Sequence, residues 1–374
     1  MLTFAVLFVA VACLAYANGA NDNFKGVATL FGSGTADYRR ALGWGSVATC
    51  AGSIAACVLA EMLLTNFSGK GLVAAELTSS SRYLAAVACG AGLTVLIATR
   101  IGMPISTTHG LVGALVGAGW AAGSPISFEK LGGTFFVPLL LSPLLAMAST
   151  GVCYLILHAS RMGFGITEQT CFCTGRETIE VVPRLDGAAM LERVGQLTVT
   201  HGTAIACHNR YAGTFLGIEV RQLVDPLHYL SAGAVSFARG LNDTPKIAAL
   251  LLTAPLLGKA GAIVAVAVLI LIGGLVSARR VAETMSRKIT PLNHGQGLTA
   301  NLVTSLVVLA ASRWGLPVST THVSCGALFG IGTVNREAQW KTIGTILLAW
   351  VTTLPAGAIL GAIAFWFLGA FKLV

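Results

Sequence analysis

Arg100-Ile-Gly-Met-Pro-Ile-Ser-Thr-Thr-His109 has a close copy further along the chain, Arg313-Trp-Gly-Leu-Pro-Val-Ser-Thr-Thr-His322. A second pair of segments precedes these two in the same order, Asn18-Gly-Ala-Asn-Asp-Asn-Phe-Lys25 and Arg239-Gly-Leu-Asn-Asp-Thr-Pro-Lys246. Chance does not supply two matched pairs in one order. The chain therefore contains an internal duplication.

Each copy is embedded in apolar sequence. Of the 374 residues, 55% are hydrophobic and 10% are charged, whereas soluble globular proteins carry about 25% charged residues. Ten apolar stretches have roughly the length needed to cross about 30 Å of hydrocarbon as helices: 2–17, 41–64, 83–99, 105–122, 134–158, 226–257, 260–278, 298–312, 318–334 and 342–370. The sequence predicts an all-α integral membrane protein, a polytopic helical bundle of about ten crossings.

The apolar stretches fall into two equal groups. A first membrane repeat occupies residues 1–158 and a second occupies 226–374, with a polar interval at 159–225 between them. An odd number of crossings in each half makes the second half enter the membrane from the opposite side, so the repeats are inverted. Inverted repeats recur in secondary transporters, whose substrate site lies near the bilayer midplane between the repeats.

The formal net charge of +9 does not indicate a nucleic-acid partner, because the basic residues stand at the ends of apolar stretches. If the stretches alternate across the bilayer, one side receives most of these residues: Arg39, Arg40, Arg161, Arg279, Arg280, Arg287, Lys288, Arg336 and Lys341. The positive-inside rule makes that side cytoplasmic. We expect a multi-pass protein of the cell (inner or plasma) membrane, with both termini outside and the 159–225 interval in the cytoplasm.

The four repeated motifs resemble those of the PiT family of inorganic phosphate transporters, which have a Gly-Ala-Asn-Asp type motif and a Pro-Ile/Val-Ser-Thr-Thr-His motif in each half. The resemblance covers both membrane repeats and leaves the polar interval outside it. It implies a secondary active permease that takes up inorganic phosphate by alternating access, in symport with H⁺ or Na⁺. Some relatives carry sulfate, so sulfate or another tetrahedral oxyanion stays open as the substrate.

Two other classes of protein are alternatives. An anion channel would need a continuous polar path, against which buried acids argue only weakly. An enzyme is not expected, because we find neither a Gly-x-x-x-x-Gly-Lys-Ser/Thr loop nor a nucleophile with its base. No cofactor is expected beyond the transported phosphate and the coupling ion, and a homodimer is left open.

Two acids, Asp22 and Asp243, lie in apolar segments, where an acidic side chain costs at least about 2.5 kcal/mol on insertion. They directly follow Asn21 and Asn242. Gly and Asn let a helix unwind and leave oxygen atoms free to bind a cation. We expect broken helices at both motifs, with these four residues in a site for the coupling ion.

Lys25 and Lys246 stand where the PiT motif usually has Asn, and this departure occurs in both halves. An ammonium beside each acid can take the place of a bound sodium ion, because it brings one positive charge to the same carboxylate. Three other interpretations are a simple ion pair with the acid three residues earlier, direct binding of the anion, and extension to the membrane interface.

The Ser-Thr-Thr triplets indicate helix starts. Pro104 and Pro317 disfavour helix in the residue before them, and Ser106 or Ser319 is then a natural N-cap. The first N–H groups of a helix have no internal acceptor and its dipole is positive at that end, which suits a phosphate or sulfate oxygen. The expected anion ligands are the two triplets: Ser106, Thr107, Thr108, Ser319, Thr320 and Thr321.

The residues around the triplets have two interpretations each. His109 and His322 either relay protons, since an imidazole titrates near a pKa of about 6.5, or brace packed helices. Arg100 and Arg313 either attract the anion or anchor helix ends. Close helix packing is the role expected for the small residues that follow, at Gly113, Gly117, Gly326 and Gly330.

The polar interval contains Cys171, Cys173, Cys207 and His208, which match the residue types that bind zinc. Their spacing is loose, so a regulatory or linking domain without a metal is the alternative. Thiols on the cytoplasmic side stay reduced, and a disulfide is therefore not expected.

Overall fold

The computed structural model describes residues 2–167, 169–176, 181–183, 189–191, 197–211, 213, 215–252 and 257–371. The chain divides into two compact units. The membrane unit comprises Met1–Tyr154 and Tyr229–Val374, and the interval unit comprises Leu155–His228.

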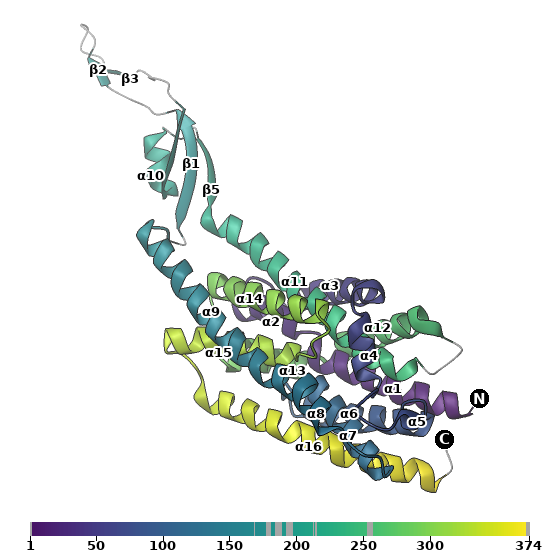
Figure 1. The fold of residues 1–374 in the computed structure, drawn as a ribbon. Coiled ribbons are helices and arrows are strands. Elements are labelled where there is room, and N and C mark those ends of the chain that lie inside the picture. The colour runs from purple at the N-terminus through teal and green to yellow at the C-terminus, as the bar shows by residue number, and fades with distance from the viewer. Residues whose placement is uncertain are drawn as a thin grey trace. The chain divides into compact units, whose positions relative to one another are not determined.

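The chain is predominantly helical (Figure 1). The first repeat consists of α1 (Leu2–Asp22), η1 (Lys25–Val27), α2 (Ala28–Gly32), α3 (Tyr38–Leu59), α4 (Glu61–Phe67), α5 (Ala75–Thr78), α6 (Ser81–Arg100), α7 (Thr107–Ala121), α8 (Phe128–Lys130), η2 (Leu131–Phe136) and α9 (Val137–Gly163). The second consists of α11 (Val220–Ala248), η3 (Ala249–Leu251), α12 (Gly258–Ser277), α13 (Arg279–Glu283), η4 (Thr284–Lys288), α14 (His294–Arg313), α15 (Thr320–Asn335) and α16 (Trp340–Ala370).

Seven helices in the described part of the chain are long and apolar enough to cross a membrane. They confirm a helical, multi-pass membrane protein. The two helices that follow the Ser-Thr-Thr motifs, α7 and α15, begin at these motifs and have 15 and 16 residues. The total of about ten crossings stays a prediction from the length of the apolar stretches.

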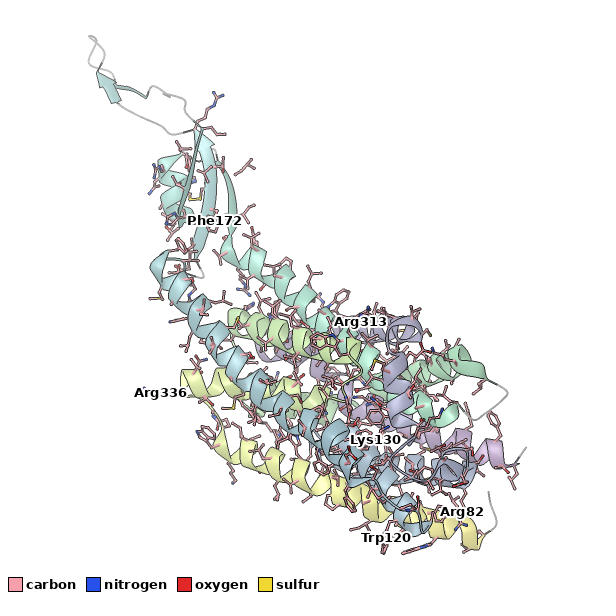
Figure 2. All side chains as sticks on the ribbon, viewed as in Figure 1. Arg82, Trp120, Lys130, Phe172, Arg313 and Arg336 are labelled. Carbon is pink, nitrogen blue, oxygen red and sulfur yellow. A yellow bond between two sulfur atoms is a disulfide. The ribbon has the colours of Figure 1, made fainter. Side chains whose placement is uncertain are left out.

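Aromatic and basic side chains mark one end of the helical bundle. Arg82 donates to the carbonyl oxygen of Phe365 at 2.8 and 3.0 Å and lies over the Phe365 ring. Trp120 packs near Trp366. Figure 2 shows Arg82 and Trp120 at this end and Arg336 at the opposite end. Such residues anchor helices at a membrane interface.

The last helix of each repeat packs against a helix of the other repeat. A Cβ atom added at Gly113 of α7 would lie 2.2 Å from the carbonyl oxygen of Leu354 in α16. A Cβ atom added at Gly326 of α15 would lie 2.4 Å from the carbonyl oxygen of Pro143 in α9. The helices approach so closely because these positions lack side chains. The predicted packing role of the repeated glycines is confirmed.

The predicted break at the Asn-Asp motif is present in the first repeat only. Helix α1 ends at Asp22, and the chain resumes as η1 and α2. In the second repeat α11 continues through Asp243 to Ala248, so the break predicted there is wrong. The two copies differ at Gly26, which packs against Ser236 where a Cβ would clash. Its counterpart is Ile247, whose side chain favours regular structure more than glycine does.

The interval unit contains strands that the sequence did not lead us to expect. Its three-stranded antiparallel sheet has the order β4-β1-β5, and its helix is α10 (Ala204–Arg210). The strands are β1 (Thr170–Arg176), β4 (Leu197–Thr203) and β5 (Phe215–Glu219), and a second sheet pairs β2 (Val181–Pro183) with β3 (Ala189–Leu191). The core of the unit contains three of the chain's cysteines.

Candidate functional site

Both Ser-Thr-Thr motifs start a helix as predicted. The Ser106 side chain accepts a hydrogen bond of 3.1 Å from the backbone N–H of His109, at the start of α7. The Ser319 side chain accepts an equivalent bond of 3.2 Å from His322, at the start of α15. Both serines are fully buried. Two positive helix ends therefore lie inside the membrane unit.

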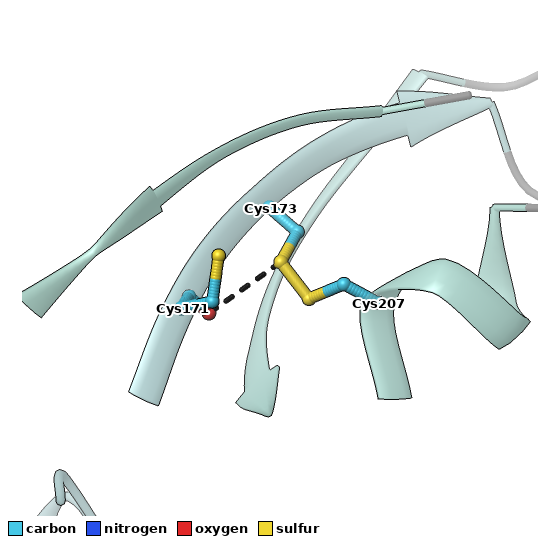
Figure 3. Close-up of side chains that lie close together, drawn as sticks. All are labelled: Cys171, Cys173 and Cys207. Carbon is cyan, nitrogen blue, oxygen red and sulfur yellow. Dashed lines mark hydrogen bonds between the residues drawn. A yellow bond between two sulfur atoms is a disulfide. The ribbon is translucent and has the colours of Figure 1, made fainter. Parts of the chain in front are cut away.

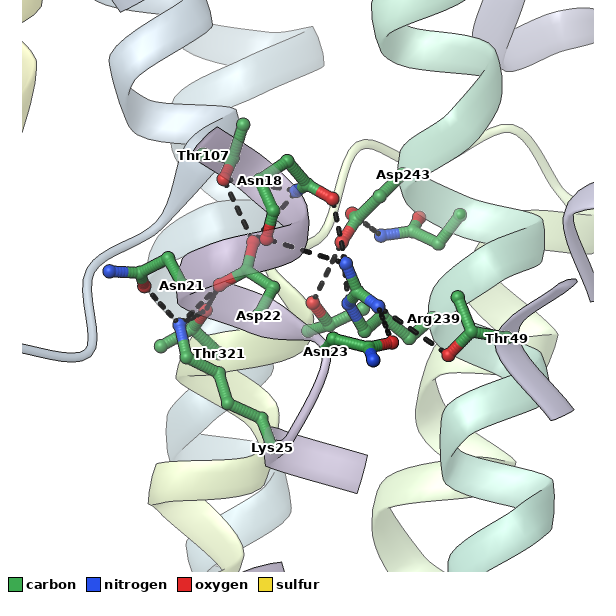
Figure 4. Close-up of polar contacts among 12 residues, drawn as sticks. Asn18, Asn21, Asp22, Asn23, Lys25, Thr49, Thr107, Arg239, Asp243 and Thr321 are labelled. Carbon is green, nitrogen blue, oxygen red and sulfur yellow. Dashed lines mark hydrogen bonds and ion pairs between the residues drawn. The ribbon is translucent and has the colours of Figure 1, made fainter. Parts of the chain in front are cut away.

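Asp22 is bound by side chains from both repeats (Figure 4). One carboxylate oxygen accepts hydrogen bonds of 2.8 Å from Asn18 and 2.8 Å from Thr107. The other oxygen accepts from Thr321 of the second repeat at 3.3 Å and pairs with Lys25. Both oxygens of the buried carboxylate therefore have hydrogen-bond or ion-pair partners.

Asp243 has matching partners in the second repeat. Thr320 donates to one carboxylate oxygen at 3.3 Å, and Asn242 donates to the other at 3.1 Å. Lys246 pairs with the same carboxylate at 3.4 Å. Arg239 lies 3.7 Å away and takes the place that Asn18 has beside Asp22.

Each lysine joins its own acid to the opposite repeat. The Lys25 ammonium donates to Asn21 at 2.7 Å and to Thr321 at 2.7 Å. The Lys246 ammonium donates to Thr108 of the first repeat at 2.9 Å. The exposed fractions of the two lysines are 4% and 1%, so extension to the membrane interface is wrong. The predicted pairing with the acid three residues earlier is present in both halves.

The two ammonium groups have similar oxygen shells. The Lys25 ammonium also donates to the carbonyl oxygen of Ile105 at 2.9 Å. The Lys246 ammonium donates to the carbonyl oxygen of Val318, the counterpart of Ile105, at 2.7 Å. Each shell therefore combines a carboxylate, a threonine hydroxyl and a backbone carbonyl. Carbonyl and side-chain oxygens of this kind also bind sodium in transporters.

Arg239 belongs to the site, although the sequence did not lead us to single it out. Its exposed fraction is 1%. The guanidinium donates to Asn18 at 2.7 Å and to Asn23 at 3.1 Å. Its Nε atom is buried without a hydrogen-bond acceptor among the described residues. The signal in the sequence was a charge at one position of the repeat, where the first copy has the neutral Asn18.

The charges of these residues do not balance. Three cationic side chains, Lys25, Lys246 and Arg239, face two carboxylates. All five are buried in the membrane unit. An uncompensated charge is expensive at low dielectric constant. One excess positive charge beside two helix N-termini therefore favours an anion at this place.

The two motif histidines pack against each other. The ring centroids of His109 and His322 are 4.4 Å apart, and His322 stacks on Trp350 at 3.8 Å. The buried His322 ring, stacked on Trp350 and in contact with the partly buried His109 ring, fits the bracing interpretation. Two of their nitrogen atoms, Nδ1 of His109 and Nε2 of His322, have no hydrogen-bond partner in the described part of the chain.

A basic cavity of about 550 Å³ adjoins the site on one side and is lined by Arg100, Arg279 and Arg280. Thr99 also lines this cavity, and its hydroxyl accepts a hydrogen bond of 2.9 Å from Asn21, the neighbour of Asp22. Arg100 therefore lines a positively charged cavity that comes within one hydrogen bond of the Asn21-Asp22 motif.

In the second repeat, α4 covers the position that corresponds to this cavity. Ser312 donates to Asn242 at 3.3 Å, as the counterpart of the bond between Thr99 and Asn21. The next loop is held by α4, because Asn66 donates to the carbonyl oxygen of Gly315 at 3.0 Å. A Cβ atom at Gly315 would lie 2.4 Å from Met62 of α4. The two sides of the site therefore differ although the motifs are repeated.

The interval cysteines form a separate group. Cys173 and Cys207 are joined by a disulfide, which the sequence did not lead us to expect. The reason is that β1 and α10 place the two residues side by side in the small core, an arrangement that their separation in sequence does not reveal. The Cys171 sulfur lies within 4.8 Å of both partners, and His208 is not in this group.

The model of the "Phosphate transporter family" matches residues 18–361. A protein of Pyrococcus horikoshii named as a phosphate permease is 27% identical over 393 residues, which span 94% of each chain. A Rhizobium meliloti protein named as a low-affinity inorganic phosphate transporter is 35% identical over 150 residues, or 37% of this chain and 45% of the relative.

A solved structure titled "The sodium-dependent phosphate transporter" has the same fold, with a TM-score of 0.74 at 19% identity. The match covers 99% of this chain and 100% of that one. The shared architecture extends over the polar interval as well as the two membrane repeats.

Proposed function

The chain belongs to the phosphate transporter family, and we propose that it carries inorganic phosphate across the membrane by exposing the site at Asp22 and Asp243 to the two sides in turn. The observation that supports this site most strongly is its charge. Three buried cations face two buried carboxylates next to two capped helix N-termini. An oxyanion would neutralise the excess charge and accept from hydroxyl and N–H donors.

The hydroxyl groups that phosphate would use as donors are already hydrogen-bonded to the two carboxylates of the site in this structure. Thr107 donates to Asp22, and Thr320 donates to Asp243. Binding therefore exchanges hydroxyl contacts with carboxylates for contacts with phosphate oxygens. The buried Nε of Arg239 lies 3.7 Å from Asp243 and has no hydrogen-bond acceptor among the described residues, so it offers a first contact that breaks no existing hydrogen bond.

The carboxylates favour phosphate over sulfate. Phosphate keeps at least one O–H group at neutral pH and donates it to a carboxylate such as Asp22, whereas sulfate only accepts hydrogen bonds. An anion that only accepts would face two carboxylates without a proton between them, which is repulsive. Sulfate remains the second substrate to be measured.

The difference between the two sides of the site fits alternating access. The cavity lined by Arg100, Arg279 and Arg280 reaches Thr99, one hydrogen bond from Asn21. On the other side α4 covers the equivalent loop through Asn66. We infer that phosphate approaches the site from this arginine-rich side, which the positive-inside rule assigns to the cytoplasm.

The coupling ion is inferred from Lys25 and Lys246, which stand where the family motif usually has Asn. The structural neighbour is sodium-dependent by its title. Here the ammonium groups of Lys25 and Lys246 fill shells of oxygen atoms beside the two acids. We infer that the lysines supply the positive charge that a sodium ion would bring, so transport does not require sodium and depends on protons instead.

The test is counterflow in liposomes that contain the purified protein. Labelled phosphate should accumulate against its gradient when the lumen is loaded with unlabelled phosphate, and labelled sulfate should accumulate less. Saturable uphill flux excludes a channel. Equal counterflow of sulfate and phosphate would contradict the substrate assignment, and purely downhill flux would contradict the carrier mechanism.

A further inference from the structure

The interval unit brings three cysteine sulfur atoms close together (Figure 3). Cys171 and Cys173 are two residues apart on β1, so their side chains leave the strand on the same face. Cys207 reaches this face from α10. All three residues are buried, and their sulfur atoms lie within 4.8 Å of one another.

A structural disulfide would account for only two of these residues. Cys173 and Cys207 form that bond, while Cys171 is a free, buried thiol beside it. In a tetrahedral zinc site with Zn–S bonds of about 2.3 Å, neighbouring sulfurs are about 3.8 Å apart. Three sulfurs within 4.8 Å can therefore reach one ion after small side-chain rotations. The third sulfur is what distinguishes a metal site from a simple cross-link.

The unit also needs a cross-link of some kind. Among the described residues of this unit, the buried core comprises the three cysteines and Tyr211, with Phe215 packed against them. A core of this size does not stabilise a small fold alone, and disulfides and structural metals are the usual substitutes. A disulfide supplies this support when the unit is oxidised, and a metal supplies it when the unit is reduced.

We propose that Cys171, Cys173 and Cys207 form a redox-gated site for a thiophilic metal ion of the Zn²⁺ class. A dithiol reductant transfers two electrons and two protons to the Cys173–Cys207 bond and is itself oxidised to a disulfide. Zn²⁺ then displaces the protons of the three thiols, and water completes its coordination. Oxidation by a disulfide reverses the sequence and releases the ion.

His208 is not one of the ligands, although it adjoins Cys207 in sequence. Its ring lies against Gly213, where an added Cβ atom would be 3.1 Å from Cε1. The site proposed here is independent of phosphate transport, because it uses residues of the interval unit alone.

The experiment uses the full-length protein in detergent. Seven of the nine cysteines are free in the oxidised state, so a thiol titration should rise from seven to nine after reduction. The reduced protein, freed of reductant without oxygen, is then titrated with Zn²⁺ against a chromophoric chelator. One equivalent should bind in addition to any zinc that the oxidised protein retains.

Cys171→Ser is the decisive variant, because it removes the third sulfur and leaves both partners of the disulfide. It should lose the additional zinc while its thiol titration still rises by two on reduction, which shows that the Cys173–Cys207 disulfide still forms. Cys207→Ser should lose both the additional zinc and the rise in the thiol titration. The matched control is Cys57→Ser in α3, which should lose neither. Zinc binding by Cys171→Ser equal to that of the parent, or no additional zinc in the reduced parent, would overturn the proposal.

Discussion

Lys25 of the first repeat donates a hydrogen bond of 2.7 Å to Thr321 of the second. Lys246 makes the reciprocal bond to Thr108 at 2.9 Å. Each ammonium thus holds an acid of one repeat against the capped helix of the other. The lysines therefore connect the two repeats.

Replacing both lysines should create a requirement for sodium. In the double variant Lys25→Asn with Lys246→Asn, each carboxylate loses its cation, and a sodium ion can enter the vacated oxygen shell. Uptake into proteoliposomes should continue for the parent in potassium or choline and should need sodium for the variant. Lys259→Asn, which removes a lysine paired with Glu61 outside the site, is the control. Saturable sodium stimulation of the parent at fixed membrane potential would refute the substitution.

Asp22→Asn and Asp243→Asn should each abolish uptake without preventing membrane insertion. Each change removes one of the two buried negative charges and leaves the cations of the site less compensated. Phosphate uptake and surface expression are measured together. Asp37→Asn is the control, because this residue is an exposed N-cap of α3 and Asn is an equally good cap. Uptake within about twofold of the parent in both variants would remove the acids from the mechanism.

Arg239→Asn should weaken phosphate binding by about tenfold or more. The change gives the second repeat the residue type of Asn18, and it removes a charged donor, for which one hydrogen bond is worth about 1.5 to 3 kcal/mol. Equilibrium binding of labelled phosphate to the purified protein measures the effect. Arg336→Asn is the matched control, since Arg336 has φ 60° at the end of α15, a conformation that Asn tolerates. An unchanged Kd in Arg239→Asn would exclude a role for its guanidinium.

Replacing Ser106, Thr107 and Thr108 together by alanine should also weaken binding. The change removes two hydroxyl donors and an N-cap, and each neutral hydrogen bond is worth about 0.5 to 1.5 kcal/mol. The same equilibrium measurement applies. Triple replacement of Ser79, Ser80 and Ser81, at the start of α6, controls for the loss of a helix cap away from the site. A normal phosphate Kd in the first variant would show that the α7 terminus does not bind the anion.

The interval should be cytoplasmic. Cys171 and Cys173 are too buried to report its side, so a cysteine is better introduced at Ile205 of α10, which is 75% exposed. A membrane-impermeant thiol reagent should label Ile205→Cys only after permeabilisation of the cells. It should label Glu76→Cys, in exposed α5 between α3 and α6, in intact cells. Labelling of Ile205→Cys in intact cells would invert the orientation.

The repeated motifs carried most of the information about the site. Two prolines and two serines predicted both capped helices, and the spacing of Asp22 and Lys25 predicted their ion pair. The helix break predicted at Asp243 was wrong. The polar motif is the same in both halves, and the residue that distinguishes the second copy, Ile247, lies downstream of it. Arg239 was missed because its function depends on residues far away in sequence, such as Asn18 and Asn23. The strands and the disulfide of the interval likewise depend on pairing between distant segments.

The packing of each repeat's last helix against the other repeat also concerns how the protein can be assembled. Because α16 covers the glycines of α7 and α9 covers those of α15, neither half possesses the helix that closes it. A half expressed alone would turn bare backbone toward lipid and would pair with any second copy that offered the missing helix. Fusion of the halves into one polypeptide guarantees a partner of the opposite orientation at every synthesis. The connecting interval is the segment that keeps the two halves in one polypeptide.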